Sequence, residues 1–428
     1  MVRDRTGAGC PEFRFKRVNM AKKHIKILVG GVPYGCDNVG DEAILLGIVD
    51  SLKKALPSAV ITVSTRTPLE TARKLRVRTV PLYGFVPPRY SHIGLLRELF
   101  STDIFLWGGA TGLSDYPGVP LYLGRLAKLL GKKLVLYSVG MNDELNPSFY
   151  KLRPGGKTTI LRFLGRLFDL KEDPVRKYEQ ALAGLTRKKI KRLLNKADLV
   201  IVRDEQTKAL LSAIGVTADV HATADPAVLI EPVSGIRLDR IWKGQKLWED
   251  DKPIVVFGIS SQSKINQVQD VALLADHLIK ERFCHVLYVS MGRNDRSVSD
   301  EIMKKMLCGD EARVLEGFFE PEEIAGILGK ASLVISSRLH LLILASISGA
   351  PIAGISRGSK IDNFLSLFGE RSCGGFESFD PEALKRTAVR LLKDQAAYRK
   401  KAGAKLEELK AKARENIRLL EEFAGKSF

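Results

Sequence analysis

The sequence predicts an α/β protein built from two Rossmann-like halves that face each other across a cleft. Two observations indicate this fold class. Short apolar runs of strand character alternate with amphipathic runs of helical period, and glycines stand where the predicted strands end. The alternation occurs twice, on either side of a polar stretch, and a chain of 428 residues is long enough for two separate cores.

The first half is predicted over residues 24–232, with a parallel, doubly wound sheet. Its first strand, 24–29, runs into a glycine-containing loop, and Asp41 is placed to cap the helix that follows. Glycines also follow the strands that end at positions 107 and 139. The predicted strands cover 24–29, 60–64, 103–107, 133–139 and 198–203, the predicted helices cover 43–56 and 121–130, and 220–229 closes this half.

The second half is predicted over residues 252–379, after an interdomain linker at 233–251 that is polar and carries two tryptophans. Residues 380–428 form a charged helical extension, with Asp380 and Pro381 as N-cap and first helical residue. Two such halves with a C-terminal helix packing back on the first describe a GT-B-like architecture. The predicted strands cover 254–259, 285–290, 313–315, 333–335 and 351–355, and the predicted helices cover 268–280, 300–306, 321–328 and 341–347.

Charge and cysteine content restrict the classes of partner. The formal net charge is +19, and residues 151–200 alone carry 14 Lys/Arg against 5 Asp/Glu. Such an excess favours anionic partners. Five scattered cysteines without a Cys-x-x-Cys pair indicate reduced thiols in a cytosolic protein. We therefore expect neither a bound metal nor a cofactor.

The chain is expected to be cytoplasmic. Residues 1–23 lack the apolar core of a signal peptide and are predicted to be a disordered basic arm, with Met20 as an alternative start. Residues 339–356 are free of charge but contain Ser, Gly and Pro, so they read as helix, turn and strand rather than a membrane span. Residues 158–195 are basic and apolar, which fits either an interfacial helix on the inner, anionic membrane face or a core helix with solvated lysines.

The strongest candidate site is the junction at residues 336–340. A strand ends at Ser336 and Ser337, and Arg338 and His340 open the next helix. In an open α/β sheet, ligands bind at the carboxyl ends of strands, where helix N-termini offer free N–H groups. A fixed cation beside an imidazole suits a phosphorylated or carboxylated ligand. The alternative is that Arg338 only caps the strand and His340 is a satisfied helix histidine.

The loop after the first strand is a second candidate. Its glycines stand at positions 30, 31, 35 and 40, which is neither a Walker A motif nor a Gly-x-Gly-x-x-Gly motif. The loop is either a structural turn or a place where backbone amides approach a ligand at the head of a helix.

Four stretches together resemble the polysaccharide pyruvyl transferase family. Residues 37–43 resemble its first motif, Gly-Asn-x-Gly-Asp-Glu-Ala, and residues 107–110 with Asp115 resemble its glycine loop, although Ala110 replaces a glycine. Residues 202–226 resemble its Arg-Asp to Asp-Pro segment, and the similarity runs in order over 27–369. The residues that fit its C-terminal signature are Ser336, Arg338, Leu339, His340, Gly349, Pro351, Lys360, Asp362 and Phe364.

The resemblance implies transfer of an enolpyruvyl-derived group from phosphoenolpyruvate, as co-substrate, to a sugar, forming a pyruvate ketal. His340 is then the candidate general acid, Asp41 the candidate base, and Lys360 a ligand for a phosphate. Arg203 would face Arg338 across the cleft, although a salt bridge from Arg203 to Asp204 or Asp225 is the alternative. The donor site implied is Arg203, Arg338, Leu339 and His340, and the substrate loops are Asn38, Gly40, Asp41, Glu42, Gly108, Gly109 and Lys360.

Two departures from the family pattern concern the acceptor. The loop after 254–259 lacks the arginine often found there, and Lys264 or Arg293 are the candidates to replace it. After 351–355, Arg357-Gly358-Ser359 stands where an aromatic residue and Pro are more usual.

Two other functions remain open. A GT-B glycosyltransferase using a nucleotide sugar would fit the fold, but the Glu-x7-Glu of retaining members is missing because no glutamate lies between Glu323 and Glu370. A non-catalytic protein that binds anions or nucleic acid would fit the charge. No nucleic-acid module is recognisable, and aromatics are few, so no specific nucleic acid is expected.

Overall fold

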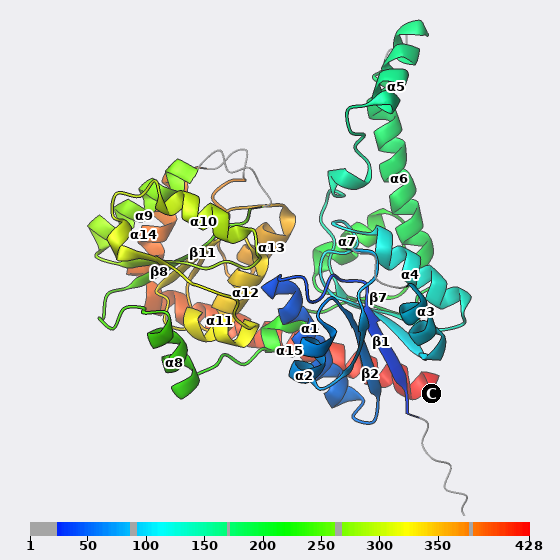
Figure 1. Ribbon diagram of the computed structural model, residues 1–428, viewed down its shortest axis with the longest axis horizontal. Coiled ribbons are helices and arrows are strands. Elements are labelled where there is room, and N and C mark those ends of the chain that lie inside the picture. Colours follow the sequence, from blue (N-terminus) through cyan, green and yellow to red (C-terminus); the bar gives the residue numbers. More distant parts are fainter. Residues whose placement is uncertain (1–23, 86–91, 169–171, 262–267, 376–379) are drawn as a thin grey trace, which may run out of the picture.

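A computed structural model of the protein describes residues 24–85, 92–168, 172–261, 268–375 and 380–428 (Figure 1). The basic arm predicted at 1–23 lies outside the described residues, as does Lys264. The described chain forms two α/β halves side by side, which confirms the predicted fold class.

The first half is a parallel sheet in the order β3-β2-β1-β4-β5-β6-β7. The strands are β1 Lys26–Gly30, β2 Val60–Thr65, β3 Arg78–Pro81, β4 Ile104–Gly108, β5 Lys133–Val139, β6 Leu199–Val202 and β7 Val220–Ala222. The helices are α1 Val39–Ala55, α2 Pro68–Leu75, α3 His92–Ser101, α4 Gly118–Leu129, α5 Gly156–Leu167, α6 Pro174–Leu194 and α7 Glu205–Ala213, with 3-10 turns η1 Pro147–Phe149 and η2 Pro226–Leu229.

The second half repeats this order as β10-β9-β8-β11-β12, again parallel. The strands are β8 Ile254–Gly258, β9 His285–Tyr288, β10 Ala312–Val314, β11 Leu333–Ser336 and β12 Ile352–Gly354. The helices are α8 Ile236–Gly244, α9 Val268–Arg282, α10 Asp295–Met303, α11 Pro321–Leu328, α12 Leu339–Ile347, α13 Ser359–Leu367, α14 Pro381–Lys393 and α15 Gln395–Ser427, with the 3-10 turn η3 Gly309–Glu311.

Each sheet reverses its winding direction once, and these two points position the site. The reversal lies between β1 and β4 in the first sheet and between β8 and β11 in the second. Loops leaving neighbouring strands there turn to opposite faces, which opens a crevice at the carboxyl ends of the strands. The loops after β1, β4 and β11 carry the motifs predicted from the sequence.

Several local predictions needed correction. Helix α1 begins at Val39, so Asp41 is not its N-cap; Asn38 is, and its side chain accepts a hydrogen bond from the Gly40 N–H. Helices α2, α3 and α7 and the edge strand β3 were not predicted, and β3 shows why, since none of its four residues is fully buried. Residues 233–251 contain α8, which buries Leu238 and Trp242 in the second core.

The two halves share elements. Helix α15, shown in red in Figure 1, runs beneath both halves. It contributes Leu409 and Ala413 to the second core and Leu419 and Leu420 to the first. Asp380 and Pro381 are the N-cap and first residue of α14, as predicted.

Helices α5 and α6 form a long hairpin that stands away from the rest of the first half (Figure 1). Its root is α6, where Ile190, Leu193 and Leu194 are buried in the first core. Among the described residues, no helix is both long enough and apolar enough to cross a membrane.

Candidate functional site

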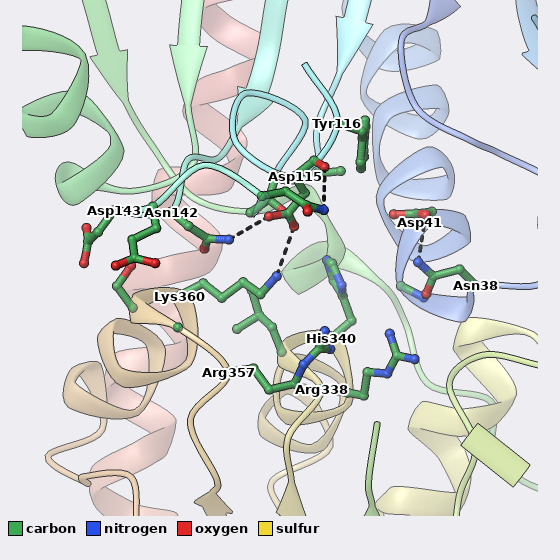
Figure 2. A pocket seen from close by; sticks show the side chains of 18 of the residues that line it. Asn38, Asp41, Asp115, Tyr116, Asn142, Asp143, Arg338, His340, Arg357 and Lys360 are labelled. Carbon is green, nitrogen blue, oxygen red and sulfur yellow. Dashed lines mark hydrogen bonds and ion pairs between the residues drawn. The ribbon is translucent and has the colours of Figure 1, made fainter. Parts of the chain in front are cut away.

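A cavity of about 830 Å³ lies between the two halves, at the two points where the sheets reverse. Side chains from both halves converge on it (Figure 2). The predicted residues that line it are Asn38, Gly40, Asp41, Arg203, Arg338, Leu339, His340 and Lys360. Side chains far apart in the sequence thus meet in one place; Lys360 and Asp115, for example, are 245 positions apart.

Three predicted substrate-loop residues lie elsewhere. Glu42 turns away and accepts a hydrogen bond from the Gly35 N–H at 2.7 Å. The Gly108 carbonyl accepts a hydrogen bond from the Tyr34 hydroxyl at 2.5 Å. Gly109 has a φ of +69°, and a Cβ there would lie 2.2 Å from the Ile44 side chain. These residues shape the loops around the cavity without facing it.

Arg338 is held by a carboxylate from a helix that the sequence did not connect with it. The Ser336 hydroxyl accepts from the Arg338 N–H at 2.8 Å and turns the chain out of β11 into α12. The guanidinium then pairs in a bidentate manner with buried Asp295, with N···O distances of 2.9 and 2.5 Å. Ser261 donates to the same carboxylate. Arg338 is therefore rigidly aimed and still lines the cavity.

His340 lies at the junction of the halves. Its Nε2 is 3.5 Å from Asp225 Oδ2, and Arg203 approaches the same oxygen at 3.6 Å. Burial alone would raise the pKa of Asp225, but the contact with His340 and the Arg203 charge outweigh it and lower that pKa. The imidazole packs against Gly40, where a Cβ would lie 2.4 Å from Nδ1. Gly40 is thus required for this close approach of the two halves.

Arg203 makes both ion pairs that the sequence offered as alternatives. Its Nε is 3.4 Å from Asp204 and its Nη1 3.6 Å from Asp225. The side chain is 4% exposed and lines the cavity all the same. Both contacts are long for ion pairs, so Arg203 retains donors for a ligand.

Asp41 is the acidic group with the most altered titration at the site. Burial, followed by the charge of Glu42, raises the pKa of Asp41 to about 7. A hydrogen bond from Asn38 Nδ2 at 2.7 Å opposes this shift only in part. A carboxyl with a pKa near neutrality can take up or release a proton at physiological pH.

A polar cluster that the sequence did not assign to the site forms the opposite wall. Asp115 accepts from Asn142 Nδ2 at 2.8 Å and faces Lys360 Nζ at 3.3 Å (Figure 2). Asn142 lies three residues after the end of β5, and that position near a strand end was the signal that could have identified it. Arg357, noted only as a departure from the family pattern, also lines the cavity.

The positively charged side chains in the cavity destabilise one another's protonated forms. Burial, followed by the Arg338 charge, lowers the pKa of Arg357 to about 10. Burial also lowers the pKa of Lys360, and Arg357 and Arg203 act in the same direction against Asp115. Binding an anion here would relieve this repulsion. The hydroxyl of Tyr116 and Oδ1 of Asn142 have no hydrogen-bond partner within the described chain, and both residues line the cavity.

Of the two expected substitutes for the missing arginine, Lys264 lies outside the described residues and Arg293 does not reach the cavity. Arg293 is 74% exposed, pairs with Asp37 at 2.5 Å and does not line the cavity. No cluster of metal-ligating side chains occurs in the part of the chain that is described.

The fold is GT-B-like, and solved structures of low sequence identity share it. UDP-GlcNAc 2-epimerase from Neisseria meningitidis, solved with UDP-GlcNAc, superposes with a TM-score of 0.58 at 12% identity, over 94% of this chain and 100% of that one. HepE from Anabaena, solved with UDP and glucose, superposes with a TM-score of 0.58 at 13% identity, over 94% of this chain and 100% of that one. MnaA from S. aureus, solved with UDP, superposes with a TM-score of 0.57 at 13% identity, over 91% of this chain and 94% of that one.

The family follows from the sequence match rather than from these folds. The model of the polysaccharide pyruvyl transferase family matches residues 38–359, most of the chain, and the protein belongs to that family. This confirms the resemblance drawn from the motifs. The search of curated proteins gave no match.

Proposed function

We propose that this protein transfers a pyruvyl group from phosphoenolpyruvate to a saccharide, forming a cyclic ketal. The observation that carries the proposal is the cluster of Arg203, Arg338, Arg357 and Lys360, four cations gathered in one cavity between the halves. Phosphoenolpyruvate carries a phosphate and a carboxylate, and it would relieve the mutual repulsion of these cations.

The donor would bind between the two halves. Arg338 is aimed by Asp295 and Arg203 by Asp225, so both guanidinium groups are held in place before a ligand arrives. Lys360 and Arg357 would neutralise the phosphate. The N–H groups at the start of α12, around Leu339, add donors at the positive end of the helix.

The reaction needs one proton delivered and one removed at each stage. Protonation of the methylene carbon of the donor gives an oxocarbenium-like centre, which a first sugar hydroxyl attacks. The phosphate then leaves with its oxygen, and a second hydroxyl closes the ketal. One hydroxyl proton ends on the new methyl group and the other on the phosphate, so the protein is returned unchanged.

His340 is our candidate acid and Asp41 our candidate base. Asp225 orients the imidazole from one side and Gly40 contacts it from the other. Asp41 is in the first turn of α1, and a pKa of about 7 suits a base that works near neutral pH. Asn38 would hold the Asp41 carboxyl in place.

The acceptor would be a sugar of a cell-surface polysaccharide or of its lipid-linked precursor, met on the cytoplasmic side. The cavity opens beside residues 143–147, where Asp143 and Glu144 are exposed and polar. Acidic and amide side chains in this wall are suited to sugar hydroxyls.

A thermal-shift titration with phosphoenolpyruvate tests the donor site. Ligand that binds only the native state raises the melting temperature by mass action, and we expect a rise of a few degrees in the parent. The rise should be lost in Arg338→Ala and reduced in His340→Ala. Each variant is compared with and without ligand, because Arg338→Ala also leaves Asp295 unpaired and lowers the baseline stability.

Arg237→Ala is the matched control, since Arg237 also pairs with a carboxylate but lies outside the cavity. It should retain the full shift. An unchanged melting temperature of the parent with phosphoenolpyruvate, together with a clear rise with a nucleotide sugar, would replace the proposal with a glycosyltransferase.

A further inference from the structure

The α5–α6 hairpin, residues 156–167 and 174–194, carries an apolar face that nothing in the described structure covers. Ile160, Phe163, Leu164, Leu167 and Phe168 follow the i, i+3, i+4, i+7, i+8 spacing of one helix face. Their exposed fractions are 59, 63, 37, 61 and 66%. Packing of α5 against α6 therefore leaves this face open, and it stands at the part of the molecule farthest from the cores (Figure 1).

Basic side chains surround this face. Helix α5 carries Lys157, Arg162 and Arg166 with no acidic residue, and α6 carries seven basic residues against Glu179 alone. All ten basic side chains are exposed, and none of them forms an ion pair with a carboxylate within the described residues. The hairpin is thus both strongly apolar on one side and strongly cationic around it.

The combination of an apolar face and a basic surround allows three kinds of binding partner to be compared. A second copy of the chain would place two hairpins of the same high positive charge against each other, which disfavours a dimer through this surface. A nucleic acid would take the charge but leave the five apolar side chains in water. An anionic lipid bilayer takes both, because the apolar face enters the acyl boundary while the basic residues meet the headgroups.

We infer that the α5–α6 hairpin docks this protein on an anionic membrane surface. The hairpin enters the headgroup region in the manner of an amphipathic interfacial helix, without crossing the bilayer. Two independent signals, apolar insertion and a basic cluster, are what stable peripheral attachment requires.

Docking would also bring the candidate site to the membrane. The cavity wall at residues 142–147 is followed by η1, and residues 150–155 connect η1 to α5, so the hairpin begins a short stretch of chain away from the rim of the cavity. This step rests on the proposed function, since it implies that the acceptor is presented by a lipid carrier in the same membrane. The docking itself does not rest on it.

Co-sedimentation of the full chain with vesicles tests the docking without any substrate. Vesicles of phosphatidylcholine alone are compared with vesicles that also contain phosphatidylglycerol, at low and high salt. We expect binding to the anionic vesicles only, weakened by salt. The double variants Phe163→Ser with Leu167→Ser, and Arg162→Glu with Arg166→Glu, should each lower the partition coefficient by about tenfold or more.

Matched variants control for hydrophobicity and charge. Ile236→Ser with Leu307→Ser removes side chains that are 80 and 78% exposed but lie on the second half. Arg399→Glu with Lys400→Glu reverses two exposed charges at the start of α15. Both controls should bind vesicles like the parent. Circular dichroism confirms that every variant is folded.

Three results would overturn the inference. Equal partition of parent and α5 variants would remove the hairpin from any docking role. A concentration-dependent dimer that the α5 variants abolish, with no vesicle binding, would assign the face to a second copy. Salt-sensitive binding to duplex DNA or RNA, again with no vesicle binding, would assign it to nucleic acid. None of these measurements uses phosphoenolpyruvate. A negative result in the phosphoenolpyruvate titration would therefore not change how they are interpreted.

Discussion

At the scale of the residue, the site depends on buried charges that constrain one another. Asp41 is 7% exposed and is flanked by Glu42, so its ionised form is disfavoured. His340 has a carboxylate on one side and the backbone of Gly40 on the other. Acid–base chemistry needs groups whose protonation is set by their surroundings in this way.

The raised pKa of Asp41 predicts how stability depends on pH. The native state keeps this proton up to about pH 7, whereas the unfolded chain releases it near 3.8. Between these values the native state binds more protons, so Asp41 lowers the free energy of unfolding as pH rises. At about 1.4 kcal/mol per pKa unit, the loss amounts to about 4 kcal/mol at most. Asp41→Asn should gain stability relative to the parent from pH 4 to pH 8 in urea titrations.

Asp251→Asn, at an exposed position, should show no such gain. A constant difference between Asp41→Asn and the parent across this range would contradict the raised pKa. Activity separates the two roles, since loss of the base should lower kcat even where Asp41→Asn is the more stable protein.

The sequence predicted the side chains that line the cavity better than it predicted their partners. Arg338, His340, Asp41 and Lys360 follow strand ends or lie in motifs, so local patterns identify them. Asp295, which aims Arg338, is 43 positions away on another helix, and no local pattern connects the two. Only the three-dimensional fold brings such carboxylates to their cations.

At the scale of the element, a buried polar contact ties α15 to the site. Asn416 is fully buried; its Nδ2 donates to the Ala224 carbonyl at 3.1 Å, and its Oδ1 accepts from the Thr223 hydroxyl at 2.5 Å. Asp225, which orients His340, is the next residue. The C-terminal helix therefore helps to position a site that it does not enter.

Asn416→Ala should lower the free energy of unfolding by about 1–3 kcal/mol, because the Thr223 hydroxyl loses one of its two acceptors, the Ala224 carbonyl loses one of its two donors, and a buried side chain is removed. Arg414→Ala, on the exposed side of the same helix, should change it by less than about 0.5 kcal/mol. Chemical denaturation measures both. Equal effects of the two substitutions would show that the buried contact contributes nothing.

Elements were predictable where their burial was strong. The buried strands β1, β4, β5, β8 and β11 were found because their residues form continuous apolar runs. Helix α8 was taken as linker because its nine residues include four charged ones and only Leu238 and Trp242 are buried. Packing by two side chains is too sparse to leave a periodic signal.

At the scale of the whole molecule, the two halves are joined through shared helices. Helix α1 places Val39 and Ala43 in the second core and Ile44, Leu45 and Ile48 in the first. Helix α15 also serves both cores: Leu409 and Ala413 lie in the second core, and Leu419 and Leu420, further along the helix, lie in the first. Neither core is complete without a helix that also serves the other.

This sharing predicts a single cooperative unfolding transition. Leu409→Ala in the second core and Leu420→Ala in the first should each lower the stability of the entire molecule, by about 2–5 kcal/mol. Calorimetry should show one transition that moves to lower temperature in both variants, and Leu307→Ala, at an exposed position, should leave it in place. Two separate transitions, each sensitive to only one substitution, would mean that the halves unfold independently.

The place of α15 in the chain also has a consequence for biosynthesis. Domains generally fold in the order in which they leave the ribosome. Here the first half emerges early, but Leu419 and Leu420 of its core are translated only after the strands and the other helices of the second half. Until they arrive, the groove that α15 fills stays exposed on an otherwise assembled sheet, and the nascent chain must be kept from aggregating for the whole time that the second half takes to be made.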